Sequence, residues 1–379
     1  MKSLISKQRL RISGTIGSLF IQALVFFLFS GCSSAWQIIN PYSSVDWEKD
    51  GQYKANLHTH TMVTDGWMNP QTTVEKYRER DYRILAITDH RIITYPWQEF
   101  SKFPVGPKSD QRIKHLVLKP QEDEPIAPGD TVFKNVNPAD VGMVDIQGGE
   151  LWFKKHELNC FFSDYCGADT EGFLDTLAAK GGIAVFNHPG RYKLPASWYV
   201  ALYKQYSPIV GFEVFNCDNR YPNDRNLWDS ILTVMAPVRP VWGFSNDDMH
   251  SMRDLGKDWN VFILPEANQK NVRYAMENGI SYFIHAPMGH KGTPAPAIQM
   301  IRVNPRQKTI KIKASGYQSI AWISGGNTLH KGKHFHVRRL PPDIRYVRAE
   351  LYGDKNSIVC TQPFFVISIN PVNFIRQKH

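Results

Sequence analysis

Residues 53–66 read YKANLHTHTMVTDG, which places two histidines directly behind a short strand-like run. Because side chains alternate between the two faces of a strand, His58 and His60 are expected to point to the same side. The loop that follows brings the carboxylate of Asp65 toward the same strand end. Two imidazoles and a carboxylate form a metal-ligand set, although a lone H-x-H also arises by chance, as His334-Phe335-His336 shows.

Further ligand-type residues follow at or just beyond the ends of later predicted strands. In chain order they are Thr88-Asp89-His90, Gly148-Gly149-Glu150, His156, Asn187-His188-Pro189 and Asp248-Met249-His250. The carboxyl ends of the strands of an α/β barrel meet on one face, where active sites are built. We therefore expect these side chains to converge.

Short apolar runs alternate with helix-like stretches from Tyr53 to Ile284, which predicts an α/β fold. The expected strands cover residues 54–58, 83–89, 143–149, 183–186, 209–215, 241–245, 259–264 and 280–284, with helices after Pro70 and over residues 170–180, 224–236 and 269–278. This rhythm predicts a parallel sheet with helices outside it, and about seven such units can close into a barrel.

Two regions break the rhythm. Residues 91–140 contain seven prolines and few periodic stretches, which predicts an elaborated loop over the barrel mouth. From about residue 295 to residue 379 short alternating runs replace the helices, which predicts a C-terminal β-sandwich-like domain.

The ordered set of motifs resembles the PHP (polymerase and histidinol phosphatase) superfamily. The shared motifs are H-x-H-x4-D-G, T-D-H, G-G-E with a nearby histidine, N-H-P and D-x-H, and they span residues 50–290. Glu213-Val214-Phe215-Asn216 and the residues after His156 are most similar to the branch of carbaryl-hydrolase-like metallohydrolases. The resemblance implies a distorted (β/α)7 barrel.

The resemblance also implies which residues hold metals. It assigns His58, His60, Glu150 and Asp248 to one ion; Glu150, His156 and His188 to a second; and Asp65, His90 and His250 to a third. Glu150 would bridge two ions around a shared hydroxide, and Glu150, Asp248 and His188 would be catalytic through these metals. Mixed imidazole and carboxylate ligands suit zinc, manganese or iron. Asp89, Glu213 and Asp247 are interpreted as carboxylates that orient ligands, and Arg191 as a candidate for gripping a substrate phosphate.

A metal-dependent phosphoesterase acting on a small phosphorylated substrate is the function that the resemblance implies. An amide or carbamate hydrolase is the alternative, because metal-activated hydroxide attacks carbonyl carbon as well. A non-catalytic metal-containing binding protein is the alternative from another class. No nucleic-acid polymer is expected as a partner, because the chain carries an export signal.

That signal occupies residues 1–32. Four basic residues precede an apolar stretch, Leu19 to Phe29, which ends at Ser30-Gly31-Cys32. This order is typical of export signals, and the small residues before Cys32 resemble the lipobox of bacterial lipoproteins. We expect lipidation of Cys32 and an anchor in the outer membrane facing the periplasm.

Charge and cysteine content add two weaker expectations. Residues 300–379 hold fourteen Lys and Arg against Asp343, Glu350 and Asp354, which predicts a basic surface that is either simply solvated or faces anionic groups. Cys160 and Cys166 are close enough in sequence to bridge, but four cysteines allow three pairings. The chain has no CxxC pair, so a zinc ribbon or thioredoxin-like site is not indicated.

Overall fold

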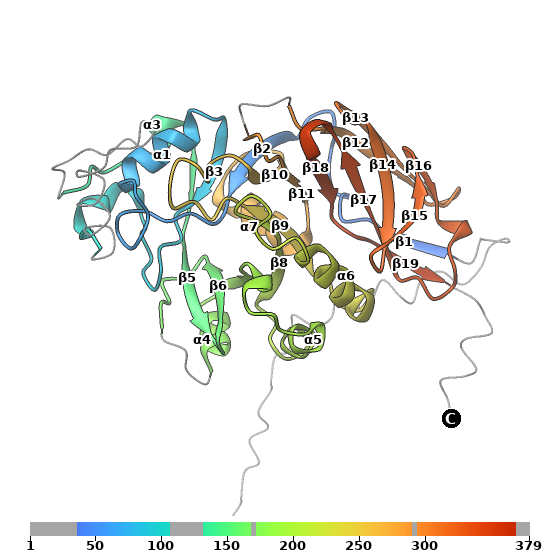
Figure 1. The fold of residues 1–379 in the computed structure, drawn as a ribbon, viewed down its shortest axis with the longest axis horizontal. Helices are drawn as coiled ribbons and strands as arrows, with labels where there is room; N and C mark the ends of the chain where they lie inside the picture. The colour runs from blue at the N-terminus through green and yellow to red at the C-terminus, as the bar shows by residue number, and fades with distance from the viewer. Residues whose placement is uncertain (1–35, 107–131, 168–171, 290–293, 369–379) are drawn as a thin grey trace, which may run out of the picture.

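The computed structural model describes residues 36–106, 132–167, 172–289 and 294–368, so Cys32 and the export signal lie outside the described residues. Strands alternate with helices up to β11, and strands dominate the remainder (Figure 1). The α/β class predicted from the sequence is confirmed.

One sheet has five strands in the order β5-β6-β7-β8-β9. β7, β8 and β9 are parallel, whereas β6 is antiparallel to both β5 and β7. β7 is buried along its whole length, as expected for a strand covered on both faces. The strands span Gly148–Phe153, His156–Phe161, Ile183–Phe186, Ile209–Asn216 and Trp242–Asn246.

The larger sheet begins with the parallel strands β4, β3 and β2 and continues through β10 and β11, which pair antiparallel. Two isolated parallel bridges, Thr59 with Met249 and His90 with Glu150, join this sheet to the five-stranded one. The strands span Gly51–Asn56 (β2), Tyr82–Ala86 (β3), Val144–Ile146 (β4), Asp258–Leu264 (β10) and Ser281–His285 (β11).

The prediction of parallel pairing throughout is wrong for β5, β6, β10 and β11. β5 and β6 form a hairpin whose two turn residues, Lys154 and Lys155, both have positive φ, at 46° and 66°. Such a turn matches the twist of paired strands and usually contains Asn or Gly. Lysines at both turn positions gave no hairpin signal in the sequence.

In the part of the chain that the structure describes, six α-helices lie between these strands. The first helix, α1, starts where the Asn69 side chain accepts a hydrogen bond from the Thr72 amide at 2.8 Å and Pro70 occupies the first turn, a favourable N-terminus. The structure adds a helix that the sequence did not predict, α5. The helices span Pro70–Arg78 (α1), Pro138–Val141 (α3), Phe173–Ala179 (α4), Ala196–Gln205 (α5), Asp224–Met235 (α6) and Gln269–Asn278 (α7).

The C-terminal strands continue the larger sheet, because β18 pairs antiparallel with β11 and β1, near the N-terminus, pairs with β19 (Figure 1). Three strands, β12, β13 and β16, form a separate small sheet. The strands are Trp36–Ile39 (β1), Ala297–Asn304 (β12), Thr309–Ser315 (β13), Ser319–Ser324 (β14), Asn327–Lys331 (β15), His334–His336 (β16), Tyr346–Tyr352 (β17), Ile358–Thr361 (β18) and Phe364–Ser368 (β19). The two regions predicted as separate domains therefore share one sheet.

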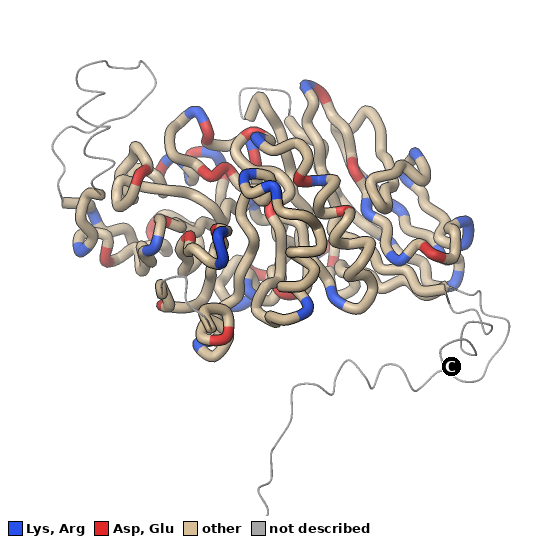
Figure 2. Tube along the Cα trace, turned by 60° about the horizontal axis from the view of Figure 1, so that its bottom comes forward, with Lys and Arg blue, Asp and Glu red and all other residues tan. Residues whose placement is uncertain are grey.

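The small sheet carries much of the predicted basic surface. Arg302, Lys311 and His334 lie directly opposite one another on its three strands, and all three are exposed. Figure 2 shows Lys and Arg distributed over this end of the molecule. His336 is exposed as well, so this second H-x-H lies on the surface of the small sheet.

Part of the segment 91–140 packs into the protein. Trp97, Phe100 and Phe133 are buried in a second hydrophobic cluster together with Met249, and the Val136 amide donates to the Trp97 carbonyl at 3.0 Å. The two described ends of this segment are thereby held together, and residues 107–131 between them lie outside the described residues.

Cys160, Cys166, Cys217 and Cys360 are free thiols in the described chain, so the bridge considered for Cys160 and Cys166 is not formed. None of the described helices is long and apolar enough to cross a bilayer.

Candidate metal centre

Eight of the nine predicted ligands converge at the adjoining ends of the two sheets. They come from short segments after β2, β3, β7 and β9 and from β5 itself. Gly66 lies so close to the backbone that a Cβ there would be 2.5 Å from the His60 carbonyl oxygen. The tight turn permitted by glycine is what folds Asp65 back onto the strand end that carries the two histidines.

The inner part of the cluster consists of His58, His60 and Asp248, with Glu150 beside the two histidines. His58 Nε2, His60 Nε2 and Asp248 Oδ1 are 3.2–3.3 Å from one another. The two Glu150 oxygens lie 3.4 Å from His58 Nε2 and 3.3 Å from His60 Nε2. A tetrahedral ion with bonds of about 2.0–2.1 Å spaces its ligand atoms by roughly 3.3–3.4 Å. The spacing of the His58, His60 and Asp248 atoms fits one such ion, and Glu150 lies next to them.

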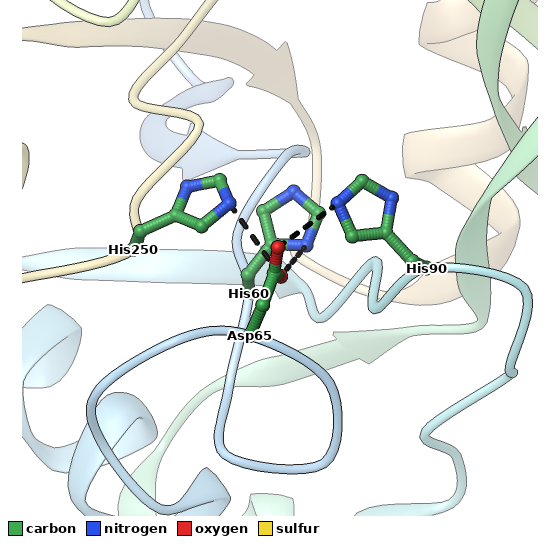
Figure 3. Close-up of side chains that lie close together, drawn as sticks. All are labelled: His60, Asp65, His90 and His250. Carbon is green, nitrogen blue, oxygen red and sulfur yellow. Dashed lines mark ion pairs between the residues drawn. The ribbon is translucent and has the colours of Figure 1, made fainter. Parts of the chain in front are cut away.

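An outer group surrounds Asp65 (Figure 3). Its carboxylate oxygens lie 3.5 Å from His90 Nε2, 3.5 Å from His250 Nε2 and 3.7 Å from His60 Nδ1. His60 stacks between His90 and His250, with ring centroids 4.5 and 4.3 Å away. Asp65, His90 and His250 therefore form a second ligand-type group next to the first.

A third group involves Glu150, His188 and Glu157. Glu150 Oε1 is 3.0 Å from His188 Nε2, which lies 3.7 Å from Glu157 Oε2. Glu157 Oε1 in turn lies 3.7 Å from His90 Nδ1. Glu150 is thus at the centre of the whole cluster, which is the position that a carboxylate shared between ions requires.

Several buried polar atoms of the cluster make no hydrogen bond. They include Glu150 Oε2, His60 Nδ1 and His188 Nδ1, although His90 Nδ1 lies 3.0 Å from Glu150 Oε2. Buried polar atoms are almost always satisfied, and each exception is costly. The donor set, its spacing and these orphaned atoms together fit divalent cations.

Buried carboxylates hold the ligands in place. Glu213 accepts from His58 Nδ1 at 2.8 Å and from the His188 amide at 2.8 Å, so it orients two ligands at once. Asp89 accepts from the Thr61 amide and from three threonine hydroxyls, and thereby shapes the loop to Asp65. Asp247 accepts instead from three backbone amides, those of residues 256, 257 and 258.

The electrostatics of the cluster favour the binding of cations. Burial alone raises the pKa of a carboxyl group and lowers that of an imidazole. Despite burial, His58, His188 and His90 hold the pKa of Glu150 well below its ordinary value. Burial likewise opposes protonation of His90, yet Asp65 and Glu150 raise its pKa to about 10. For His60, burial and the neighbouring His250 and His90 lower the pKa to about 3. Ionised carboxylates and a neutral imidazole are the forms that bind metal.

Left-handed backbone is concentrated at the same place. Arg91, His188 and Asp248 have φ of 56°, 27° and 46°, and residues 217–219 form a run with φ of 44°, 62° and 53°. Non-glycine residues adopt this conformation at a cost, and such residues cluster at functional sites. Here the strained turns aim His188, Asp248 and Arg220 into one pocket.

The structure does not bring His156, which was predicted as a ligand, into this cluster. Its Nδ1 lies 2.8 Å from the Glu157 carbonyl oxygen and its Nε2 lies 3.0 Å from the Tyr199 hydroxyl, and Trp198 stacks on the ring. In the β5–β6 hairpin Glu150 is opposite Asn159 and Trp152 is opposite Glu157. Residues directly opposite share a face, so Glu157 lies on the Glu150 side and His156 on the core side.

The cluster forms the floor of a pocket of about 680 Å³ with three arginines in its walls, namely Arg91, Arg191 and Arg220. Arg191 Nη1 donates to Glu157 Oε2 at 3.0 Å, and Arg220 Nη1 lies 3.9 Å from Asp248 Oδ2. Side chains of both arginines are about half exposed, at 52% and 46%. Arg191 thus lies in the wall of this pocket, whereas Glu157 and Arg220 were missed. No sequence signal was available for Glu157, because its face depends on the pairing of β6 with β5.

Comparison with known proteins points to distant relatives that act on phosphoesters. The chain is 24% identical to the 5'-3' exoribonuclease Rnm of Salmonella typhimurium, over 52% of this chain and 84% of the relative. The identity to Rnm of Escherichia coli is also 24%, with the same coverage. No protein-family model matches the chain.

Solved structures with a similar fold include PHP-like enzymes. A two-domain protein from Bacteroides vulgatus, which contains a predicted PHP-like metal-dependent phosphoesterase, has a TM-score of 0.46 and 14% identity, covering 89% of this chain and 91% of that one. A lesion-specific endonuclease from Pyrococcus furiosus has a TM-score of 0.38 and 13% identity, covering 72% and 62%. Both scores lie below 0.5, so these similarities do not establish a function for the chain.

Proposed function

We propose that this chain is a PHP-like metal-dependent phosphoesterase. The observation that carries the proposal is one pocket with a metal-ligand floor and a guanidinium rim. Arg191 and Arg220 are close enough to the ligand carboxylates to contact a phosphoryl group placed over the cluster. Guanidinium groups suit phosphoryl oxygens because they donate two hydrogen bonds in one plane.

Each of the three groups of residues would hold one metal ion. His58, His60, Glu150 and Asp248 would hold one ion, Glu150 with His188 and Glu157 a second, and Asp65, His90 and His250 a third. Bound there, zinc, manganese or iron would supply a hydroxide nucleophile from coordinated water at neutral pH and neutralise phosphoryl oxygens. Glu213 would keep the His58 imidazole in one orientation through its 2.8 Å contact with Nδ1.

The arginine rim favours a phosphoester over the neutral carbonyl of an amide or carbamate, and so weighs against the carbaryl-hydrolase-like branch as the functional model. The strained turns at the site and several unsatisfied buried atoms are costly to keep, which weighs against a non-catalytic binding protein. Because the relatives are exoribonucleases, the small phosphorylated substrates that we propose include nucleotides. The barrel is proposed as the catalytic part, with the β-rich region from residue 295 as its C-terminal partner.

Metal reconstitution tests the proposal. Purified protein is stripped with a chelator, reloaded with manganese, zinc or iron, and assayed on phosphomonoesters, phosphodiesters and carbamates. We expect two or three ions per chain by elemental analysis and turnover of a phosphoester that the chelator abolishes. At most one ion in active protein would overturn the multinuclear centre, and turnover of carbamates alone would overturn the substrate class.

The cell-envelope location is proposed from the export signal and Cys32. Replacing Cys32 by Ala should move the protein from the membrane fraction to the soluble periplasm, because the lipid chains would be missing. Mass spectrometry of the N-terminal peptide provides the direct measurement. Identical fractionation of parent and variant, with no lipid mass on Cys32, would contradict this assignment.

A further inference from the structure

A second hollow of about 430 Å³ adjoins the metal pocket. The two share Arg220 and Tyr221, which line both. The remaining walls come from the turn after β7 and from the start of α6. They are Pro189, Gly190, Lys193, Leu194, Pro222, Asn223, Asp224 and Leu227.

The two spaces differ in chemistry. The metal pocket is lined almost entirely by charged residues. The second hollow has aliphatic and ring walls in Pro189, Leu194, Pro222 and Leu227, and its polar lining consists of Lys193, Asn223 and Asp224 together with the shared Arg220 and Tyr221. An apolar pocket of a few hundred Å³ with few polar groups is typical of a site for a small organic group.

The walls of the hollow have a fixed position relative to the proposed metal ligands. Pro189 and Gly190 directly follow His188 in the same turn. A Cβ on Gly190 would lie 2.6 Å from both Asp224 Oδ1 and Tyr221 Cβ, so this turn and the start of α6 are in close contact. The Arg220 amide donates to the Asn216 carbonyl at 2.9 Å, which closes the left-handed run at residues 217–219. The hollow is therefore fixed in position beside the cluster.

We propose that this hollow binds the organic part of the substrate, and that this part contains an aromatic ring. The inference rests on the proposed phosphoesterase function and specifies its substrate class. With the phosphoryl group over the metal cluster and between Arg191 and Arg220, the ester oxygen points past Tyr221 into the hollow. The Tyr221 ring at the junction and the aliphatic walls offer flat, apolar surface of the kind on which an aromatic ring packs.

Hydrolysis in this arrangement breaks the bond between phosphorus and the ester oxygen. Water supplies the oxygen that joins phosphorus and the proton that the departing alcohol or phenol takes up. The products are inorganic phosphate and the free hydroxy compound. The hollow stabilises the ring of the substrate through burial and takes no part in bond breaking.

The test compares phenyl phosphate with methyl phosphate on metal-loaded protein, with inorganic phosphate release as the readout. Leu227→Trp fills the hollow from α6. We expect kcat/KM for phenyl phosphate to fall about tenfold, mainly through KM, because burial of the ring is lost. The value for methyl phosphate should change less than twofold.

Val234→Trp is the matched control, because Val234 lies on the same helix with 55% of its surface exposed. It should leave both kcat/KM values unchanged. Leu194→Trp fills the hollow from the opposite wall and replaces Leu227→Trp if that variant fails to fold. Equal effects of the filling variants on the two esters, or no effect on either, would overturn the subsite.

Inhibition of the parent protein gives a measurement that needs no variant. Phenylphosphonate should inhibit methyl phosphate hydrolysis about ten times more strongly than methylphosphonate does, and equal inhibition would overturn the proposal. Failure of the phosphoesterase assignment looks different, since the metal-loaded parent would then hydrolyse neither ester.

Discussion

The metal centre and the cluster around Arg348 both bury charge, but they balance it differently. Arg348, which is 1% exposed, donates from Nε to Asp229 Oδ1 at 2.9 Å and pairs through its two Nη atoms with Asp229 and Glu350 at 2.5 Å. Arg225 Nη1 adds a contact to Glu350 Oε2 at 3.2 Å. This cluster joins α6 to β17 and contains its own cation.

The metal centre has a different balance. It gathers the carboxylates of Asp65, Glu150, Glu157 and Asp248, with arginines only at the half-exposed rim of its pocket. Its orphaned buried atoms have no counterpart among the three carboxylate and guanidinium side chains at Arg348. The comparison teaches that a buried carboxylate cluster with no buried Arg or Lys of its own is suited to bind metal ions, whereas a cluster neutralised by a buried arginine connects parts of the fold.

The largest expected effect is that of Glu150→Gln on activity. The change keeps the size of the side chain but removes the charge at the centre of all three groups, so turnover of p-nitrophenyl phosphate should fall by roughly three orders of magnitude. Asp65→Asn, in the outer group, should reduce turnover less. Circular dichroism must show that both variants fold, because metal binding and folding are coupled. Near-parental activity of Glu150→Gln with its metals retained would contradict the bridging role, and Glu213 would then be tested next.

Arg348→Ala should be the most destabilising change at the other cluster. It leaves Asp229 and Glu350 buried without their cation, which costs about 3–5 kcal/mol in the free energy of unfolding. Chemical denaturation measures the loss. Arg302→Ala, at an exposed position on β12, serves as the control and should change stability by less than about 0.5 kcal/mol. Equal stability of the two variants would show that the Arg348 cluster does not connect α6 to β17.

Glu213→Gln tests the support of the ligands. Glu213 contacts His58 Nδ1 and the His188 amide, and the loss of such an orienting partner typically costs 10–100-fold in metal affinity or activity. Metal affinity measured by competition with a chelator should fall in this range while the fold is kept. An unchanged affinity would restrict Glu213 to a packing role.

A smaller effect on metal content is expected to distinguish Glu157 from its neighbour His156. Glu157→Gln should lower the metal content or activity, because the carboxylate lies 3.7 Å from both His90 Nδ1 and His188 Nε2. His156→Gln should leave the metal content unchanged, since both ring nitrogens contact groups outside the cluster. Elemental analysis of the two variants decides between them, and loss of an ion from His156→Gln alone would restore the sequence prediction.

The smallest expected effect is on the pH dependence of stability. Burial raises the pKa of Glu350, but Arg348 and Arg225 outweigh it and hold the pKa below its ordinary value. A depressed folded-state pKa stabilises the protein above the unfolded value, about 4.5, and this contribution is lost as pH falls through the folded value. Glu350→Gln should therefore flatten the acid side of the stability profile, and a profile parallel to that of the parent would contradict this pairing.

Much of the metal centre could be predicted, because the end of a strand and the direction of its side chains are determined by residues close together in the sequence. The alternation that put His58 and His60 on one face, and the turn at Asp65-Gly66, depend on residues close in the chain. Each of the motifs at His90, Glu150, His188 and Asp248 was expected at or near a strand end. Their convergence could therefore be predicted on the single assumption that these strand ends meet on one side of the fold. Glu157 could not be chosen over His156 in this way, because the choice depends on the pairing of β6 with β5.

The sequence by itself determined the α/β class, most strand and helix positions, and eight of the ligand-type residues that converge, because these depend on periodicity and motif order. Only the tertiary structure decided what depends on contacts between distant segments. Those contacts brought Arg191 and Arg220 to one rim, buried Arg348 against Asp229, placed the hollow beside the cluster and paired β18 with β11. The physical reason is that side-chain direction follows from local backbone geometry, whereas pairing and pocket walls follow from packing across the whole chain.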